Sequence, residues 1–294
     1  MSSADDSWSG PPLRRVAYTI GIWESLREVA GRWGVVKALV RRDLAVRYRK
    51  SALGVLWSLL TPLIQMVILT FVMKFVAGMN EPNLSVKILA GLVAWAYFQN
   101  SLQDCTDCIV NNRDLVKKIY FPRPALPLAV VLGNTVHLGL LLVVVLLWLL
   151  LGVPDYRPTP QALWIFPLVV IQGLMLAGLG MLLAATHTFY HDVKFMLMQL
   201  LGVLYFLTPV FYPASVIQKE MGKSAHLMHM APWAARAYMY NPMATIIESY
   251  RRILFLHRPP EMSYLLPVAA FAVVVFLVGY KVFLRASWSF PEAI

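Results

Sequence analysis

Six long apolar stretches, separated by charged or polar connections, dominate the pattern of the chain. They cover residues 51–73, 88–110, 124–154, 158–191, 195–218 and 262–280. The second is apolar only as far as Gln103 and reaches Val110 by passing Asp104 and Asp107. Because a membrane-spanning helix needs about 20 predominantly apolar residues, the pattern predicts an all-α polytopic membrane protein with six transmembrane helices.

The composition supports the same fold class. Hydrophobic residues make up 59% of the 294 residues, and charged residues only 14%. Soluble domains have about 45–50% apolar and about 25% charged residues, and a soluble chain of this length cannot hide the excess. Disorder requires low hydrophobicity, and two cysteines cannot support a disulfide scaffold. The composition therefore excludes these classes of protein.

In a soluble protein, the net charge of +11 would suggest nucleic-acid binding, but in this chain it has another interpretation. The basic residues flank the apolar stretches, which is typical of topology signals and lipid headgroup contacts and does not indicate nucleic-acid binding. They gather before residue 51 and after the second, fourth and sixth stretches. This distribution predicts a multi-pass protein with both termini in the cytoplasm. The long segment 213–261 carries basic residues too, but long loops follow the rule weakly.

The region before the first stretch predicts a tail over residues 1–12 followed by two helices. Ile22, Leu26, Val29 and Trp33 share one helical stripe, with charged residues around the rest of the helix. This arrangement favours an interfacial helix at the membrane surface, and the alternative is packing on a soluble partner. Residues 37–50 form a second, basic helix, in which we expect Asp43 to pair with Arg47 at the i, i+4 spacing.

Sequence motifs for chemistry are scarce. No phosphate-binding loop of the P-loop or dinucleotide type occurs, so we expect any ATP hydrolysis to take place on another chain. Cys105 and Cys108 have a redox or metal spacing, and His187 with His191 has a metal spacing, but neither pair has the further ligands of a zinc site in sequence. We therefore predict no metal site. Scarce charge within the spans argues against ion-coupled transport and against an embedded transferase.

The connection over residues 111–122 is the first segment with a functional interpretation. We expect an Asn cap to open a short helix and Pro122 to close it. Leu115, Ile119 and Phe121 can form an apolar face, flanked by basic side chains. The segment is either a solvated connector or, as we favour, a helix that docks into a soluble partner.

The second such segment is 213–261. Its part from Met243 to Leu256 is too apolar for a free loop and too short to span, which predicts re-entrant or interfacial helices that cap a pore. Pro242 disfavours helical geometry at Asn241, so we expect a break there between two short helices. Glu248 and Arg252 have the i, i+4 spacing of an ion pair.

Several motifs together resemble the permease subunits of ABC exporters for bacterial surface polysaccharides, including O-antigen and teichoic acids. They are RRDLAVRYRKSALGVLWSLLTPL at 41–63, KKIYFPRPALPL at 117–128, HDV at 191–193, LTPVFYP at 207–213 and NPMATIIESYR at 241–251. The resemblance covers about residues 37–285 in the order and spacing of the family. One departure is His191, where many members have Arg.

The resemblance implies an inner-membrane permease that works with a second copy of itself and two copies of an ABC ATPase. ATP and Mg²⁺ would bind the ATPase and no cofactor this chain, and the cargo would be a lipid-linked glycan. Docking on the ATPase is implied for Asn112, Arg113, Asp114, Leu115, Lys118, Tyr120, Phe121, His191 and Asp192. The inner-leaflet entrance is implied for Trp33, Arg41, Arg42, Asp43, Arg47 and Tyr48. The glycan path and its gate are implied for Trp57, Tyr97, Phe98, Phe211, Tyr212, Asn241, Pro242, Glu248 and Arg251.

We therefore divide the chain into a cytoplasmic arm (1–50), a permease domain (51–285, including the outer gate segment 213–261) and a cytoplasmic tail (286–294). Two alternatives stay open. One is a permease of the same architecture that exports drugs or small lipids. The other is a membrane-embedded glycan-processing enzyme. The aromatic residues fit stacking on sugar rings, but they also fit the aromatic belts of membrane interfaces.

Overall fold

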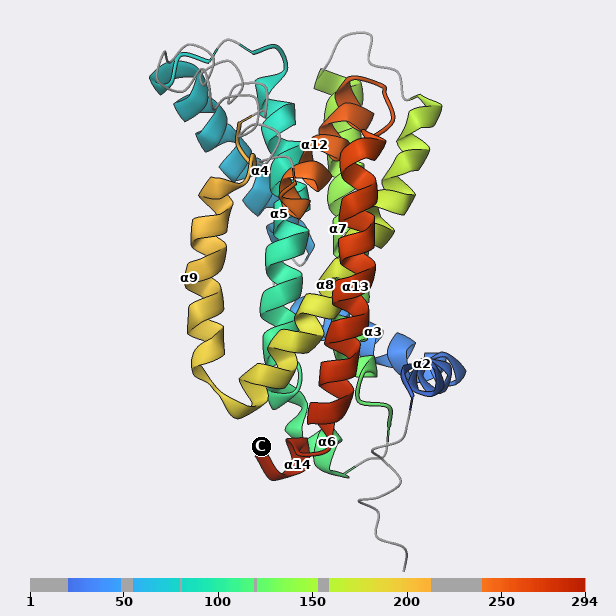
Figure 1. Cartoon of the computed structure of the whole chain (residues 1–294). Coiled ribbons are helices and arrows are strands. Elements are labelled where there is room, and N and C mark those ends of the chain that lie inside the picture. The colour runs from blue at the N-terminus through green and yellow to red at the C-terminus, as the bar shows by residue number, and fades with distance from the viewer. Residues whose placement is uncertain are drawn as a thin grey trace, which may run out of the picture.

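The computed structural model describes residues 21–48, 55–79, 81–118, 121–152, 159–212 and 240–293, and in these ranges the fold is helical, without strands (Figure 1). The helices are α2 (Ile22–Gly31), α3 (Trp33–Tyr48), α4 (Val55–Phe71), α5 (Leu84–Asp107), α6 (Arg113–Lys118), α7 (Ala125–Gly152), α8 (Ile165–Phe189), α9 (Asp192–Leu207), α12 (Pro242–Phe255), α13 (Met262–Ser287) and α14 (Phe290–Ala293). A π-helical turn (Val72–Val76) extends α4, and 3-10 turns precede α6 (Val110–Asn112) and α8 (Pro160–Trp164).

Three segments in the described ranges are long and apolar enough to cross a membrane: Ala125–Leu151, Pro160–Phe189 and Met262–Ser287. They correspond to the third, fourth and sixth predicted spans, so the all-helical membrane fold is confirmed in outline. Helices α4, α5 and α9 occupy the positions of the first, second and fifth spans. They are shorter or more polar: α4 has 17 residues, α9 has 16, and the 24 residues of α5 include Lys87, Asp104 and Asp107. That these three also cross the membrane stays a prediction.

The connecting elements divide between the two ends of the bundle. Figure 1 shows α2, α3, α6 and α14 at the lower end together with the turn from α8 to α9, and α12 at the upper end. The predicted arm, docking helix and tail thus share one end, and the expected gate helix lies at the other. This is the arrangement that the predicted topology requires.

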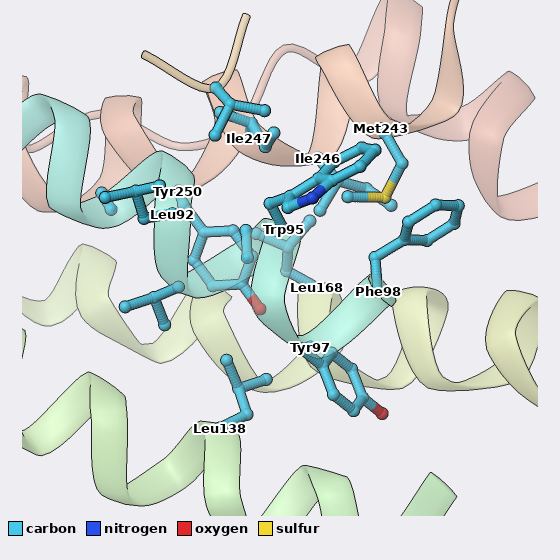
Figure 2. Packing of buried hydrophobic residues seen from close by; sticks show 14 of the residues in the cluster. Leu92, Trp95, Tyr97, Phe98, Leu138, Leu168, Met243, Ile246, Ile247 and Tyr250 are labelled. Carbon is cyan, nitrogen blue, oxygen red and sulfur yellow. The ribbon is translucent and has the colours of Figure 1, made fainter. Parts of the chain in front are cut away.

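Helix α5 lies in the middle of the bundle and buries most of its surface. Trp95 and Phe98 of α5 pack with Met243, Ile246 and Tyr250 of α12 (Figure 2). Leu138 from α7 and Leu168 from α8 belong to the same cluster. The cluster therefore fastens α12 onto the upper part of the bundle.

A second apolar cluster joins the elements of the lower end. Val29 and Leu39 of the arm pack in it with Phe121, Phe283 and Phe290, and the Ser25 hydroxyl lies 2.9 Å from the hydroxyl of Tyr280 on α13. The predicted apolar stripe of α2 thus faces its own chain at Val29, whereas Trp33 at the end of the stripe is 45% exposed. The predicted tail is partly helical, and its Phe290 is fully buried.

Candidate functional site

The predicted docking helix exists as α6, and its exposed surface is charged. Arg113, Asp114 and Lys117 are exposed, Leu115 is half-buried and Val116 is buried in the lower cluster. The side chain of Lys118 and the whole of Tyr120 and Ile119 lie outside the described residues. The helix is therefore held to the bundle from behind by Val116 and presents ionic groups outward.

Two side chains of this segment have partners within the chain. Phe121 is only 8% exposed and packs in the lower cluster, so it anchors the segment to its own chain. The Asn112 amide donates a hydrogen bond of 2.8 Å to the carbonyl oxygen of Cys108, so it links the start of α6 to the end of α5. The docking role of both residues stays a prediction. Sequence reasoning missed Val116, although its apolar character was the available signal.

Two aspartates near the end of α5 link the neighbouring elements by ionic contacts. Asp104 accepts hydrogen bonds from Arg47 of α3 and, at 3.0 Å, from the Asn134 amide of α7. Asp107 lies 2.7 Å from the ammonium of Lys194 on α9 and 3.4 Å from the His187 ring on α8. Because α6 follows α5 almost directly, these contacts connect the segment that leads into α6 to the arm and to α9.

The expected pairing of Asp43 with Arg47 was wrong. Arg47 reaches across to Asp104 and to the Asn134 amide oxygen, 2.8 Å away, while Asp43 pairs with its neighbour Arg42 at 2.8 Å. The physical reason is that α3 packs against α7, so partners from other helices lie within reach of the guanidinium. A pattern within one helix cannot reveal them.

Only some of the predicted entrance residues lie together in the structure. A cleft of about 510 Å³ between α3, α7 and the end of α5 is lined by Arg42, Asp43 and Arg47, and also by Asp104 and Asn134. Trp33 and Arg41 lie outside this cleft, and the side chain of Tyr48 is outside the described residues.

His191 and Asp192 are exposed in the α8–α9 turn, with the His187 and His191 rings 5.6 Å apart.

The expected path aromatics separate into buried and accessible groups. Tyr97 and Phe98 are buried in the upper cluster, and the Tyr97 hydroxyl lies 2.8 Å from that of Thr135, so both are structural residues of the core. The hydrophobic pattern does not show which face of α5 other helices cover, and the assignment of these two residues to the path stays a prediction. Trp57 is exposed, and Phe211 and Tyr212 are half-buried.

An aromatic row runs from Trp95 of α5 across the upper end of α9 to the residues that follow it. The Tyr205 ring centroid lies 5.6 Å from Trp95, 5.5 Å from Phe206 and 5.7 Å from Phe211. Phe211 in turn contacts Tyr212 at 4.9 Å. Aromatic residues at 205–212 thus form a connected group of rings that contacts the buried Trp95 of α5.

Helix α12 starts where the Asn-Pro step predicted. The Asn241 side chain accepts a hydrogen bond of 3.0 Å from the backbone N–H of Met243, and Pro242 is the first helical residue. A helix before Asn241 falls among residues 213–239, outside the described residues. The predicted Glu248–Arg252 pair was wrong, because Arg252 pairs with Glu261 at 2.7 Å and Glu248 with Arg251 at 3.5 Å.

Arg251 donates several hydrogen bonds at the upper end. Its buried guanidinium donates to the carbonyl oxygens of Lys87 at 3.1 Å, Tyr212 at 3.0 Å and Val210 at 2.8 Å. It therefore satisfies backbone acceptors where α9 has unwound and ties that end to α5 and α12. Gly91 permits the approach, since a Cβ there would lie 2.1 Å from the Val210 carbonyl oxygen.

The two cysteines are packed inside the bundle. Cys105 and Cys108 are buried and form no disulfide, and a Cβ on Gly180 of α8 would lie 2.7 Å from the Cys105 sulfur. Within the described ranges, no group of three or more His, Cys, Asp or Glu side chains is placed to hold a metal ion.

Comparison with known proteins gives consistent results. Residues 34–255 match the family model of the ABC-2 type transporters. The chain is 33% identical over 270 residues to the O-antigen export system permease protein RfbA of Myxococcus xanthus, covering 92% of this chain and 98% of the relative. It is 26% identical over 257 residues to RfbA of Klebsiella pneumoniae, covering 86% and 92%. It is 23% identical over 256 residues to the polysialic acid transport protein KpsM of Escherichia coli, covering 84% and 92%.

Proposed function

We propose that this chain, which belongs to the ABC-2 type transporter family, is the transmembrane subunit of an ATP-driven exporter of a lipid-linked polysaccharide. The observation that carries the proposal is the near full-length similarity to permeases named for O-antigen and polysialic acid export. These names favour a glycan cargo over the drugs or small lipids of the alternative. They equally disfavour a glycan-processing enzyme, so we propose that the chain catalyses no bond change.

We further propose that all six predicted helices cross the inner membrane and that the end carrying α2, α3, α6 and α14 faces the cytoplasm. Two observations support this. The three strongest spans are joined to α4, α5 and α9 in one bundle, and the segments richest in basic residues gather at its lower end (Figure 1). A second copy of the permease, two ATPase copies and membrane lipids complete the proposed assembly.

Helix α6 is the proposed contact with the ATPase. Val116 and Phe121 fix its rear in the lower cluster, so a push on α6 moves the bundle and does not merely bend a loop. Its exposed Arg113, Asp114 and Lys117 offer charges for recognition of a partner, and such charges give specificity at protein interfaces. His191 and Asp192 of the α8–α9 turn lie at the same end and are proposed as a secondary contact.

The test reverses the charge of the α6 surface. Arg113→Glu with Lys117→Glu should reduce glycan at the cell surface at least tenfold, because the reversed charges would face like charges on the partner, and like charges at an interface disfavour binding by more than about 1.4 kcal/mol. The matched control is Lys281→Glu with Arg285→Glu, two exposed basic residues one turn apart on α13. Surface glycan, membrane insertion and ATP hydrolysis by the purified complex are measured together.

The α6 double variant should insert normally, and the control should export normally. Normal export and unchanged hydrolysis by the α6 variant would refute the docking assignment. A separate check uses the purified chain alone, which we expect not to hydrolyse ATP. Hydrolysis that persists after removal of contaminating ATPases would contradict the proposed division of labour.

A further inference from the structure

A pocket of about 300 Å³ lies between α4, α5, α7 and α9. Asn100 and His137 in its lining are about one helical turn from Asp104 and Asn134 of the lower cleft. Its polar lining comes from Thr61, Gln65, Gln99, Asn100, His137 and Tyr205. Gln99 lies about 22 Å along the axis from the first residue of α5 and about 12 Å from the last, at 1.5 Å rise per residue. The pocket therefore lies at the depth of the middle of α5, and its α4 side, with Thr61 and Gln65, is exposed.

The amides of this pocket have hydrogen-bonding capacity to spare. The Trp95 indole N–H donates to the Gln99 side-chain oxygen at 2.8 Å, which leaves the amide N–H groups of Gln99 for another acceptor. In the described part of the chain, no side-chain hydrogen bond or ion pair reaches Gln65 or Asn100. Unpaired polar groups are strongly disfavoured against lipid hydrocarbon, so a polar ligand that hydrogen-bonds to these amides would be stabilised on this face of α4 and α5.

The chemistry of the lining selects the class of ligand. Among the described residues that line the pocket there is no Asp, Glu, Lys or Arg. A phosphate group is bound preferentially by Arg or Lys, and Ca²⁺ or Mg²⁺ by carboxylates. Side-chain amides and hydroxyls both donate and accept, as the hydroxyls of a neutral sugar do. The volume falls at the lower limit of small-molecule pockets, which suits one sugar unit and not a long segment of polymer.

An aromatic wall completes the pocket. Tyr205 lines it from α9, and its ring is held edge-on against Trp95, with centroids 5.6 Å apart. Aromatic rings with a polar tip supply an apolar surface and a hydrogen-bonding group together. The amides on one side and the Tyr205 ring on the other thus present both kinds of contact that a sugar ring requires.

We propose that this pocket is a binding subsite for a single neutral sugar unit of the exported glycan, held by Gln65, Gln99 and Asn100 against the Tyr205 ring. The proposal rests on the proposed function, because only a glycan exporter brings sugar to this depth. Contact with the subsite slows each sugar unit briefly and favours neutral units over charged ones.

Photocrosslinking in exporting cells tests the subsite directly. A diazirine amino acid replaces Asn100 in the pocket, Phe206 on the exposed face of α9, or Val274 on the exposed face of α13. After irradiation, the chain is purified and stained for periodate-oxidisable sugar, with the cell's own glycan as the probe. We expect slow-migrating, stained protein from the Asn100 and Phe206 positions and none from Val274.

The other outcomes are also decisive. Crosslinking from Phe206 but not from Asn100 would overturn the subsite and leave the proposed function intact. No crosslinking from any position would overturn both. Equal crosslinking from Val274 would show that the glycan does not follow the α4–α5–α9 face, and would overturn the subsite as well.

A substitution experiment complements the crosslinking. Gln99→Leu with Asn100→Leu keeps similar volumes and removes the amides, so surface glycan should fall about tenfold if two hydrogen bonds to the cargo are lost. Gln161→Leu, outside the pocket, is the matched control and should export normally. ATPase copurification shows that the double variant is folded, and Asn100→Ser, which keeps a donor and an acceptor, should restore part of the export. Unchanged export by the folded double variant would overturn the subsite.

Discussion

Helices α8 and α13 are joined backbone to backbone, whereas α9 is held mainly at its two ends. A Cβ on Gly279 would lie 2.2 Å from the Gly178 carbonyl oxygen, and one on Gly178 would lie 2.5 Å from that of Val275, so α8 and α13 have no room to shift. Helix α9 buries only Leu197 and Leu201. Lys194 ties its lower end to Asp107, and Arg251 ties the residues after its upper end to α5 and α12.

The difference indicates a division between a rigid frame and a movable wall. Close contacts of small residues make a helix pair stiff in a membrane, where packing and not hydrophobic exclusion drives association. Ionic and hydrogen-bonded ties can break and form again, and elements with few buried contacts open at low free energy. Helix α9 also carries part of the aromatic row and borders the proposed sugar subsite. We therefore infer that α9 moves during export while α8 and α13 stay together.

The largest expected effect comes from breaking the frame. Gly279→Leu should destabilise the protein by at least about 3 kcal/mol, because the new side chain meets backbone that cannot shift. The matched control is Gly202→Leu on α9, where a Cβ would meet nothing within 4 Å. Thermal unfolding and size-exclusion profiles of the detergent-purified proteins measure the difference. Equal stability of the two variants would contradict the rigid contact.

An intermediate effect is expected at the upper tie of α9. Arg251→Met removes three charge-assisted hydrogen bonds to backbone carbonyls and should destabilise this region by about 2–4 kcal/mol. Arg252→Met is the matched control, because its partner Glu261 is 49% exposed and exposed pairs contribute less than about 1 kcal/mol.

Hydrogen exchange locates the effect of the Arg251 substitution. Residues 208–212 should exchange faster in Arg251→Met, while the middle of α8 should be unaffected. Uniformly faster exchange across α8 and α13 would mean that Arg251 stabilises the whole fold, and α9 would then not be a separately held element.

The frame could be predicted from the sequence far better than the ties. The apolar runs located α7, α8 and α13, because burial in lipid leaves a strong, continuous hydrophobic signal. The Asn241-Pro242 step located the start of α12, since capping is a local effect. The pairs Asp43–Arg47 and Glu248–Arg252 were predicted wrongly, because helical spacing offers partners only within one helix. The actual partners of Arg47 and Arg252 are Asp104 and Glu261, and packing alone brings them near.

In the candidate sites too, local features could be predicted from the sequence, and features that depend on packing between helices could not. The docking helix was predictable from its short run between Asn112 and Pro122. That Phe121 anchors its rear and that Tyr97 and Phe98 lie in the core was not predictable, because exposure depends on which faces other helices cover. The polar pocket could not be predicted for the same reason, since its lining residues come from four helices, α4, α5, α7 and α9.

The smallest expected effect is at the lower tie of α9. The Lys194–Asp107 contact of 2.7 Å is partly exposed, with 46% of the lysine side chain accessible. Lys194→Met should therefore reduce stability by less than about 1 kcal/mol, and the loss should shrink as ionic strength rises. Asp107 keeps its contact with His187 at 3.4 Å, so the end of α5 stays linked to α8. Exchange at the first turn of α9 should rise at low salt in this variant, whereas Lys281→Met on α13 should leave α9 unchanged. A double-mutant cycle of Lys194→Met and Asp107→Asn measures the coupling energy of this contact. If that energy were zero at low salt, α9 would be held only at its upper end, and its lower end would be free to move with the α8–α9 turn.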